Sequence, residues 1–142
     1  MNSSDCIFCK IVSGELPAVR LAENEDACAF LDLVQVHPGH VLIIPKHHYA
    51  DLYALPGPVA AAVMVLAQQV ATALLAALQP AGLSLLQSNG AAAGQEVMHL
   101  HVHLLPRAAG DGLLRLYPSP PHASDAAELE ALGERIRAGL AQ

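Results

Sequence analysis

The stretch from His99 to Leu105 constrains the fold more than any other part of the sequence. It reads His-Leu-His-Val-His-Leu-Leu, so that histidines and aliphatic residues alternate strictly from His99 to Leu104. A period of two is typical of a half-buried strand, because successive side chains of a strand point to opposite faces. We therefore predict a strand over 97–105 that ends at Pro106, with the three imidazoles on one face and the aliphatic residues in the core.

Three interpretations account for the histidine face. The face is exposed and carries histidine without a role, or one or two imidazoles bind a metal ion, or one imidazole is a nucleophile whose neighbours set its tautomer and bind charge. A single ion bound by all three is disfavoured, because a rise of about 3.3 Å per residue separates His99 and His103 by roughly 13 Å.

The rest of the chain predicts a mixed fold of one domain. Turn residues and hydrophobic periodicity divide it into short strands and three helices. We expect a helix over 5–14, strands over 20–23, 27–31, 40–44 and 83–88, a helix over 57–79 and a last helix over about 125–140. Asp125, followed by Glu128, predicts the start of that last helix, in the form of a capping box.

The segment 58–78 is apolar enough to suggest a membrane span, which needs about 20 apolar residues. Gln68 and Gln69 lie in its middle, and no basic or aromatic anchor lies just outside its ends. We expect a core helix, and no membrane partner.

Charge and the chain start limit the partners and the compartment. A net charge of −6, with no basic cluster, argues against duplex nucleic acid, which proteins bind by neutralising phosphates. The first ten residues carry no basic and apolar signal pattern, so we expect a cytoplasmic protein.

The three cysteines are unevenly spaced. Cys6 and Cys9 are close enough to form a metal site or a redox pair, or to pack as two thiols without a metal. Cys28 has no nearby partner and is predicted to be a small core residue.

The stretch from Gly94 to His103, Gly-Gln-Glu-Val-Met-His-Leu-His-Val-His, resembles the signature of the histidine-triad (HIT) superfamily. Cys-Ile-Phe-Cys-Lys-Ile at 6–11, Ala-Phe-Leu-Asp at 29–32 and Pro-Gly-His-Val-Leu-Ile-Ile-Pro-Lys at 38–46 resemble its Hint-like bacterial branch. The resemblance extends from about residue 5 to Arg107.

This resemblance implies an α+β HIT-like fold: a five-stranded antiparallel sheet with a long helix and a C-terminal helix. It also implies a homodimer, in which the two five-stranded sheets join into one ten-stranded sheet. We expect a single domain over 1–142, with a core of about 5–107 and a C-terminal extension over 108–142. The implied activity is hydrolysis of nucleoside phosphoramidates or of nucleoside and dinucleoside polyphosphates, with release of a nucleoside monophosphate such as AMP.

The resemblance also assigns catalytic roles. His101 is similar to the nucleophile that forms a nucleotidyl-histidine intermediate, and His103 to the residue that binds phosphate oxygens. His99 and His40 would orient or polarise this pair. A neutral imidazole is a competent nucleophile near pH 7, and we expect protonated neighbours to stabilise the added negative charge.

The residues implied to bind substrate are spread along the chain. Asp32 is similar to the carboxylate that accepts the ribose hydroxyls, and Asn89 and Gln95 to amides near the phosphate. The positions that enclose the base are Phe8, Ile11, Phe30 and Leu33. For Asp32 and Asn89 a plain turn role stays open, and the apolar residues are also candidates for the core.

Glu96 departs from the family pattern, since several eukaryotic relatives have a serine there that assists the leaving amine. A carboxylate next to a phosphate repels it unless protonated or turned away, whereas a protonated Glu96 would be a general acid. This residue keeps two other functions open: a nucleotide-binding or scaffold protein with little turnover, and nucleotidyl transfer to an acceptor other than water.

The resemblance implies a structural zinc ion as the cofactor. In bacterial relatives with the cysteine pair, zinc is completed by residues that match His48 and the first triad histidine, which gives the ligands Cys6, Cys9, His48 and His99. Two thiolates and two imidazoles suit tetrahedral zinc. His47 is an alternative ligand.

Overall fold

The computed structural model describes residues 3–114, 116–117 and 119–140. The chain divides into two compact units, Met1–Asp111 and Gly112–Gln142. The helices of the first unit are η1 (Ser3–Asp5), α1 (Ile7–Ser13), α2 (Gly57–Leu78) and η2 (Ala91–Ala93), and its strands are β1 (Arg20–Glu23), β2 (Ala27–Leu31), β3 (Val41–Pro45), β4 (Gly82–Gln87) and β5 (Val102–Arg107). The second unit contains α3 (Ala126–Leu140).

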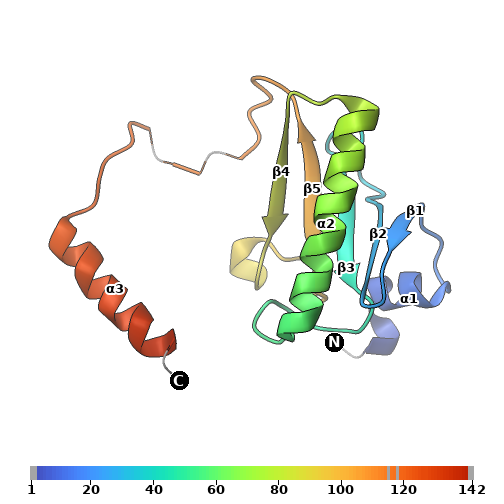
Figure 1. Cartoon of the computed structure of the whole chain (residues 1–142), viewed down its shortest axis with the longest axis horizontal. Helices are drawn as coiled ribbons and strands as arrows, with labels where there is room; N and C mark the ends of the chain where they lie inside the picture. Colours follow the sequence, from blue (N-terminus) through green and yellow to red (C-terminus); the bar gives the residue numbers. More distant parts are fainter. Residues whose placement is uncertain (1–2, 115, 118, 141–142) are drawn as a thin grey trace. The chain divides into compact units, whose positions relative to one another are not determined.

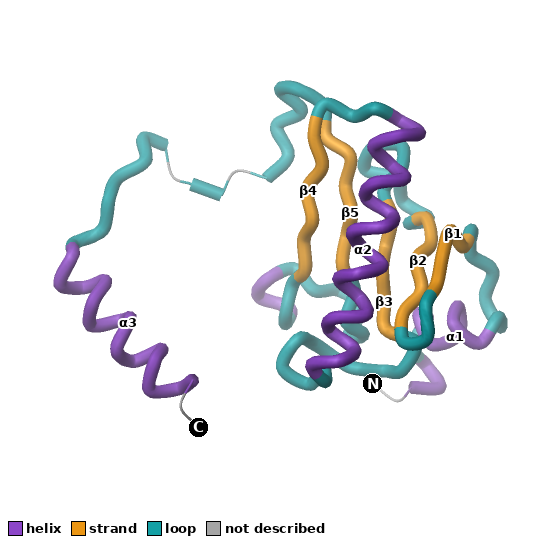
Figure 2. The backbone as a smooth tube through the Cα atoms, in the orientation of Figure 1, coloured by secondary structure: helices purple, strands orange, loops and turns teal. Residues whose placement is uncertain are grey.

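The five strands form one antiparallel sheet in the order β1-β2-β3-β5-β4, as expected. Figures 1 and 2 show this sheet with α2 running across it. Asn24 closes the β1–β2 hairpin, because its Oδ1 accepts hydrogen bonds from the backbone N–H groups of Asp26 and Ala27. The order places β3 and β5 side by side in the middle of the sheet, although 56 residues separate Pro45 from Val102.

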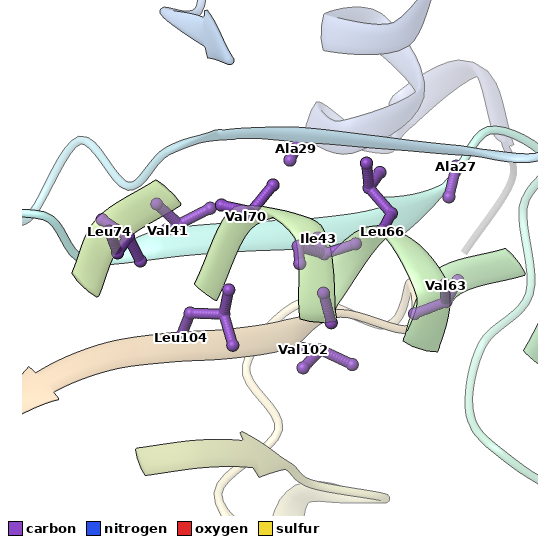
Figure 3. Packing of buried hydrophobic residues seen from close by; sticks show 11 residues of the cluster. Ala27, Ala29, Val41, Ile43, Val63, Leu66, Val70, Leu74, Val102 and Leu104 are labelled. Carbon is purple, nitrogen blue, oxygen red and sulfur yellow. The ribbon is translucent and has the colours of Figure 1, made fainter. Parts of the chain in front are cut away.

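Helix α2 covers one face of the sheet. By length and composition it would suit a membrane span, but its inner side chains pack on the strands (Figure 3). The contacts join alternate residues of β2, β3 and β5 to one stripe of the helix: Ala27, Ala29, Val41, Ile43, Val102 and Leu104 against Val63, Leu66, Ala67, Val70 and Leu74. The apolar stretch is therefore a core helix, and burial of such side chains stabilises the fold by about 1.5–3 kcal/mol each.

The opposite face of the sheet holds α1. Phe8 packs with the remaining alternate residues of β2 and β3, which are Cys28, Phe30, Leu42 and Ile44, and with Cys6. Cys28 is thus the small core residue that we expected. The helix ends at Gly14, whose φ of 83° is the left-handed conformation of a helix C-cap. The expected helix over 5–14 is divided, because Cys6 has an extended backbone between η1 and α1.

The strand that carries the histidines begins later than we predicted. β5 runs over Val102–Arg107, so the prediction of 97–105 is wrong at both ends. Residues 97–101 have no strand partner; the N–H of Leu100 instead donates to the carbonyl of Tyr49, with 2.7 Å between nitrogen and oxygen. Pro106 fits within β5 because it pairs with Leu83 of β4, while the β3 ladder has already ended at Leu104.

The second unit is a loop followed by α3. Oδ1 of Asp125 accepts hydrogen bonds from the N–H groups of Ala127 and Glu128, which confirms the predicted N-cap. The apolar residues of this helix, Leu129, Leu132, Ile136 and Leu140, are exposed.

Candidate active site

His101 lies just before β5, on the face of the sheet that also holds α1. Its Nδ1 is 2.8 Å from the carbonyl oxygen of His99. A carbonyl oxygen only accepts, so Nδ1 carries the proton and Nε2 keeps its lone pair. Phe8 lies edge-on to the imidazole, with ring centroids 5.2 Å apart, and holds its orientation. The arrangement presents Nε2 as a neutral nucleophile.

His103 lies beside His101, with ring centroids 4.9 Å apart. Its Nδ1 is 2.9 Å from Nε2 of His40. Nδ1 of His40 in turn lies 3.3 Å from the carbonyl oxygen of Val34, which accepts its proton. Nε2 of His40 is then an acceptor, and Nδ1 of His103 donates to it. His40 is therefore within hydrogen-bonding distance of His103.

The charge state of His103 differs from our expectation. Burial, followed by the nearby His101 and His40, lowers the pKa of His103 to about 4, although Asp32 opposes this shift. His103 is therefore neutral at pH 7 in the free protein, and the expectation of a protonated neighbour is wrong for this residue. The reason is that three imidazoles share a partly buried space, where charge is disfavoured.

The loop 32–40 brings Asp32 to this group. Oδ1 of Asp32 accepts the N–H of Val34, which is the turn role left open above, while its Oδ2 lies 3.6 Å from Nε2 of His40. Gln35 holds the loop: its amide nitrogen donates to the carbonyls of Asp32 and His40, and its oxygen accepts from the backbone of Gly39 and His40. The sequence analysis missed Gln35, since a loop glutamine carries no pattern that predicts this bridge.

Four cysteine and histidine side chains meet at the other end of this region. Their donor atoms all lie within 4.8 Å of one another, and the residues are Cys6, Cys9, His48 and His99. Sγ of Cys6 and Sγ of Cys9 are 3.4 and 3.6 Å from Nδ1 of His99, and Sγ of Cys9 is 3.4 Å from Nδ1 of His48. His47 is exposed and outside this group.

The spacing of the cluster fits a tetrahedral metal ion. Zinc bonds of about 2.3 Å to sulfur and about 2.0–2.1 Å to nitrogen place neighbouring sulfur and nitrogen ligands about 3.6 Å apart. Nε2 of His99 lies 2.9 Å from the carbonyl oxygen of Pro45 and donates to it, which leaves Nδ1 free of a proton and facing the thiols. Such an outer hydrogen bond is what fixes the tautomer of a metal-binding histidine.

Burial shifts the titration of this cluster. It is the main cause that lowers the pKa of His99 to about 4, so this imidazole is neutral at pH 7. Burial and the neighbouring Cys6 raise the pKa of Cys9 to about 11. The cluster thus offers a neutral imidazole in His99, and binding of a divalent cation would release the thiol protons.

The apolar residues assigned to the base differ in exposure. Phe8 and Phe30 are only 5% and 3% exposed and pack edge-to-face at 5.8 Å, so they form the floor of the region. Ile11 is partly buried against them. Leu33 is 98% exposed. A base would contact Leu33 and Ile11 more readily than the two rings.

The side chain of Gln95 is committed to the backbone. It is 3% exposed; its oxygen accepts the N–H of Gly90 at 2.7 Å, and its nitrogen donates to the carbonyls of Ala50 and Val97. Asn89 is likewise engaged, with Leu52 and Gln87. Glu96 is exposed. Gln95 and Asn89 therefore hold the loops around the histidines, which is the turn role left open for Asn89.

A surface hollow of about 660 Å³ lies elsewhere. It runs along α2 beside residues such as Leu31, Pro38 and Leu74, and none of its lining residues is titratable. The chemistry that the histidines offer is therefore separate from this hollow.

The chain is similar to known proteins of one family. A family model described as HIT domain matches residues 13–110. The chain is 40% identical over 132 residues to adenosine 5′-monophosphoramidase of Schizosaccharomyces pombe. The aligned region covers 92% of this chain and 95% of that protein.

Solved structures have the same fold. A HIT family protein from Bacillus anthracis matches with a TM-score of 0.90 and 36% identity, covering 97% of this chain and 99% of that one. A zinc-bound histidine triad family protein from Mycobacterium smegmatis matches with a TM-score of 0.73 and 34% identity, covering 97% and 99%.

Proposed function

The chain belongs to the HIT domain family, and on that premise we propose that it hydrolyses adenosine 5′-phosphoramidates and related nucleoside phosphates, releasing a nucleoside monophosphate. The relative from Schizosaccharomyces pombe is an adenosine 5′-monophosphoramidase. The observation that carries the proposal is the tautomer of His101, whose Nδ1–H donates to the carbonyl of His99.

In the first step of the proposed reaction, Nε2 of His101 attacks the α-phosphorus. A nitrogen–phosphorus bond forms, and the bond from phosphorus to the leaving amine or phosphate breaks with its electron pair going to the leaving group. A proton from water or from the exposed Glu96 completes a leaving amine. His101 then carries a positive charge in the nucleotidyl-histidine, and the carbonyl of His99 stabilises it through the Nδ1–H group.

In the second step, a water molecule attacks the same phosphorus. The oxygen–phosphorus bond forms as the bond to Nε2 of His101 breaks, and the water gives up one proton to solvent. The products are a nucleoside monophosphate and the neutral imidazole. Splitting one displacement into two is the usual benefit of a nucleophilic side chain.

His103 would donate to phosphate oxygens once a bound phosphate raises its pKa from about 4. His40 would hold its orientation through the 2.9 Å hydrogen bond. Oδ2 of Asp32 would accept the ribose hydroxyls. Ile11 and Leu33 would contact the base, with Phe8 and Phe30 beneath them.

Asn89 and Gln95 would act on substrate indirectly, by positioning the loops 50–52 and 90–97 to which they are bonded. A zinc ion bound by Cys6, Cys9, His48 and His99 would supply a structural cross-link between α1, the 46–50 loop and the approach to β5. The zinc-bound relative from Mycobacterium smegmatis supports this assignment.

The proposal extends to assembly. β4 pairs with β5 on one side only, and its Leu83 and Leu85 are exposed. Pairing of this edge with a second copy would give a homodimer with a ten-stranded sheet and would cover a regular, apolar edge. Sedimentation at the mass of a dimer supports this, and a monomer at micromolar concentration contradicts it.

We also propose that 108–142 is an extension of the one HIT domain over 1–142, and that the protein works in the cytoplasm. The free thiols of Cys6 and Cys9 fit a reducing compartment.

The function is tested by incubating the protein with adenosine 5′-phosphoramidate and following AMP release. We expect His101→Ala to lower kcat at least about a thousandfold, to keep AMP binding, and to abolish the AMP-bearing protein that an alkaline denaturing quench traps from the wild type. His122→Ala, at an exposed position, is the control. Turnover by His101→Ala at the rate of the wild type contradicts the mechanism. If the wild type binds AMP but shows no turnover, the protein is instead a nucleotide-binding module.

A further inference from the structure

Three side chains with metal-binding atoms meet outside the thiol cluster. Asp32 follows β2, His40 precedes β3 and His103 lies in β5, and their donor atoms all lie within 4.8 Å of one another. His40 is buried, while Asp32 and His103 are partly exposed. A small ion therefore has access to the group from solvent, through the side where these two residues are exposed.

The distances suit a first-row divalent metal. Nε2 of His40 lies 2.9 Å from Nδ1 of His103 and 3.6 Å from Oδ2 of Asp32. Ligand bonds of 2.0–2.2 Å in a tetrahedral site place neighbouring nitrogen and oxygen atoms about 3.3 Å apart. Each distance differs from that value by about 0.3–0.4 Å, which small rotations of the side chains can supply.

The surroundings orient the donors. Because Nδ1 of His40 donates to the carbonyl of Val34, its Nε2 points a lone pair at the group. Oδ1 of Asp32 is bonded to the backbone of Val34, which leaves Oδ2 for the group. Only His103 must change: the proton on its Nδ1 moves to Nε2, and the ring stays neutral.

We propose that Asp32, His40 and His103 form a second metal site, which takes Zn²⁺ or a similar transition-metal ion and thereby blocks nucleotide binding. Two imidazoles and one carboxylate are a typical ligand set for zinc and cobalt, whereas Mg²⁺ and Ca²⁺ prefer oxygen ligands. The blocking effect rests on the proposed function, in which Asp32 binds ribose and His103 binds phosphate. Metal binding itself does not depend on it.

The two metal sites differ in chemistry, and this makes them separable. The cluster of Cys6, Cys9, His48 and His99 binds through sulfur, so Co²⁺ there gives intense sulfur-to-metal absorption in the near ultraviolet. Co²⁺ bound by Asp32, His40 and His103 gives only weak visible bands. The two sites share no residue.

The experiment is a Co²⁺ titration of the full chain, without a histidine tag, followed by absorbance and equilibrium dialysis in the absence of substrate. We expect two equivalents, the second without sulfur bands and released by excess AMP. Asp32→Asn, which keeps the shape of the side chain, and His103→Gln should each weaken the second equivalent at least about tenfold. The exposed His122→Gln is the control and should bind two.

Binding of one equivalent by the wild type overturns the proposal. So does a second equivalent whose affinity is the same in both Asp32→Asn and His103→Gln, since it then belongs to other residues. Circular dichroism of each variant shows whether it is folded. In turnover assays, Zn²⁺ beyond one equivalent should raise the apparent KM for nucleotide and leave kcat unchanged. If the protein binds two equivalents in the titration but shows no turnover even when only the first is bound, the proposed function is overturned and the metal site is left supported.

Discussion

Nδ1 of His101 lies 2.8 Å from the carbonyl oxygen of His99, while Nδ1 of His99 faces the thiols of the cysteine cluster. One residue thus belongs to both groups: its imidazole to the candidate metal site and its backbone to the candidate nucleophile. Nothing flexible intervenes, because His99 is fully buried and its Nε2 is bonded to Pro45. The position of the nucleophile should therefore depend on the metal site.

This dependence predicts that removal of zinc slows turnover. With the ion gone, His99 loses its ligand bonds and the carbonyl that orients His101 becomes less fixed, so we expect kcat to fall about tenfold or more, with a lower Tm. Cys9→Ser should reproduce both effects and should lower the zinc content measured by elemental analysis.

Cys28→Ala is the matched control for Cys9→Ser. Cys28 is a buried cysteine outside the cluster, so this variant should keep one equivalent of zinc and the kcat of the wild type. Unchanged kcat in folded, zinc-free Cys9→Ser would show that the two groups are not coupled.

Gly39 is predicted to be irreplaceable for the loop that ends at His40. Its φ is +93°, and a Cβ there would lie 2.5 Å from Cδ1 of Leu78 and 3.2 Å from Cγ of Pro106. The left-handed conformation costs an alanine about 1–2 kcal/mol, and the crowding adds about 1–3 kcal/mol. We expect Gly39→Ala to lower the free energy of unfolding by about 2–5 kcal/mol in urea denaturation.

Gly57→Ala provides the comparison. Gly57 begins α2, has no positive φ, and a Cβ there meets nothing within 4 Å. Its free energy of unfolding should change by less than about 1 kcal/mol. If Gly39→Ala and Gly57→Ala have the same free energy of unfolding, the inference that a Cβ at Gly39 would crowd Leu78 of α2 is wrong.

Much of the fold could be predicted from local pattern. The strands over 20–23 and 27–31 and the long helix were predicted almost to the residue, because alternation, Asn and Pro–Gly turns and the apolar stripe act within a few residues. The start of β5 could not be predicted from local pattern. The alternation that begins at His99 is the same as that of a strand, but Tyr49 accepts a hydrogen bond from Leu100 and Gln95 donates one to Val97, and no local pattern shows these contacts.

The sequence predicted which residues make up the site better than it predicted their charge states and hydrogen bonds. The resemblance grouped His40 with His103, 63 residues away, and the structure places them 2.9 Å apart. It did not indicate that burial keeps His103 neutral, or that the amide of Gln95 is fully used by the backbone. Those properties depend on how many groups share a buried volume, which sequence spacing does not fix.

Gln35 is predicted to position the substrate-binding loop without touching substrate. Its amide makes one hydrogen bond to the backbone of Asp32, one to Gly39 and two to His40, so Gln35→Ala should leave the side chains of Asp32 and His40 less well placed. We expect KM for nucleotide to rise about fivefold to tenfold with a smaller change in kcat, measured by steady-state kinetics. Gln68→Ala, on the exposed side of α2, should change neither constant; a loss in kcat alone would argue against a positioning role for Gln35.

The stability of the metal-free protein should fall on acidification below pH 6.5. The folded pKa values of His99 and His103 are about 4, lowered chiefly by burial from an ordinary value of 6.5. The unfolded chain therefore takes up these protons first. The contribution of His99 and His103 to the free energy of unfolding is complete above pH 6.5, declines as the pH falls toward 4, and changes no further below pH 4.

Between pH 7 and pH 5 each histidine should account for a loss of about 1–2 kcal/mol, the lower figure applying to the partly exposed His103. Urea denaturation in the presence of a chelator measures this loss. His103→Gln should flatten the pH dependence by the share of that residue, whereas His122→Gln, in an exposed position, should follow the wild type. Parallel curves for His103→Gln and the wild type would contradict this prediction, because they would mean that folding does not lower the pKa of His103.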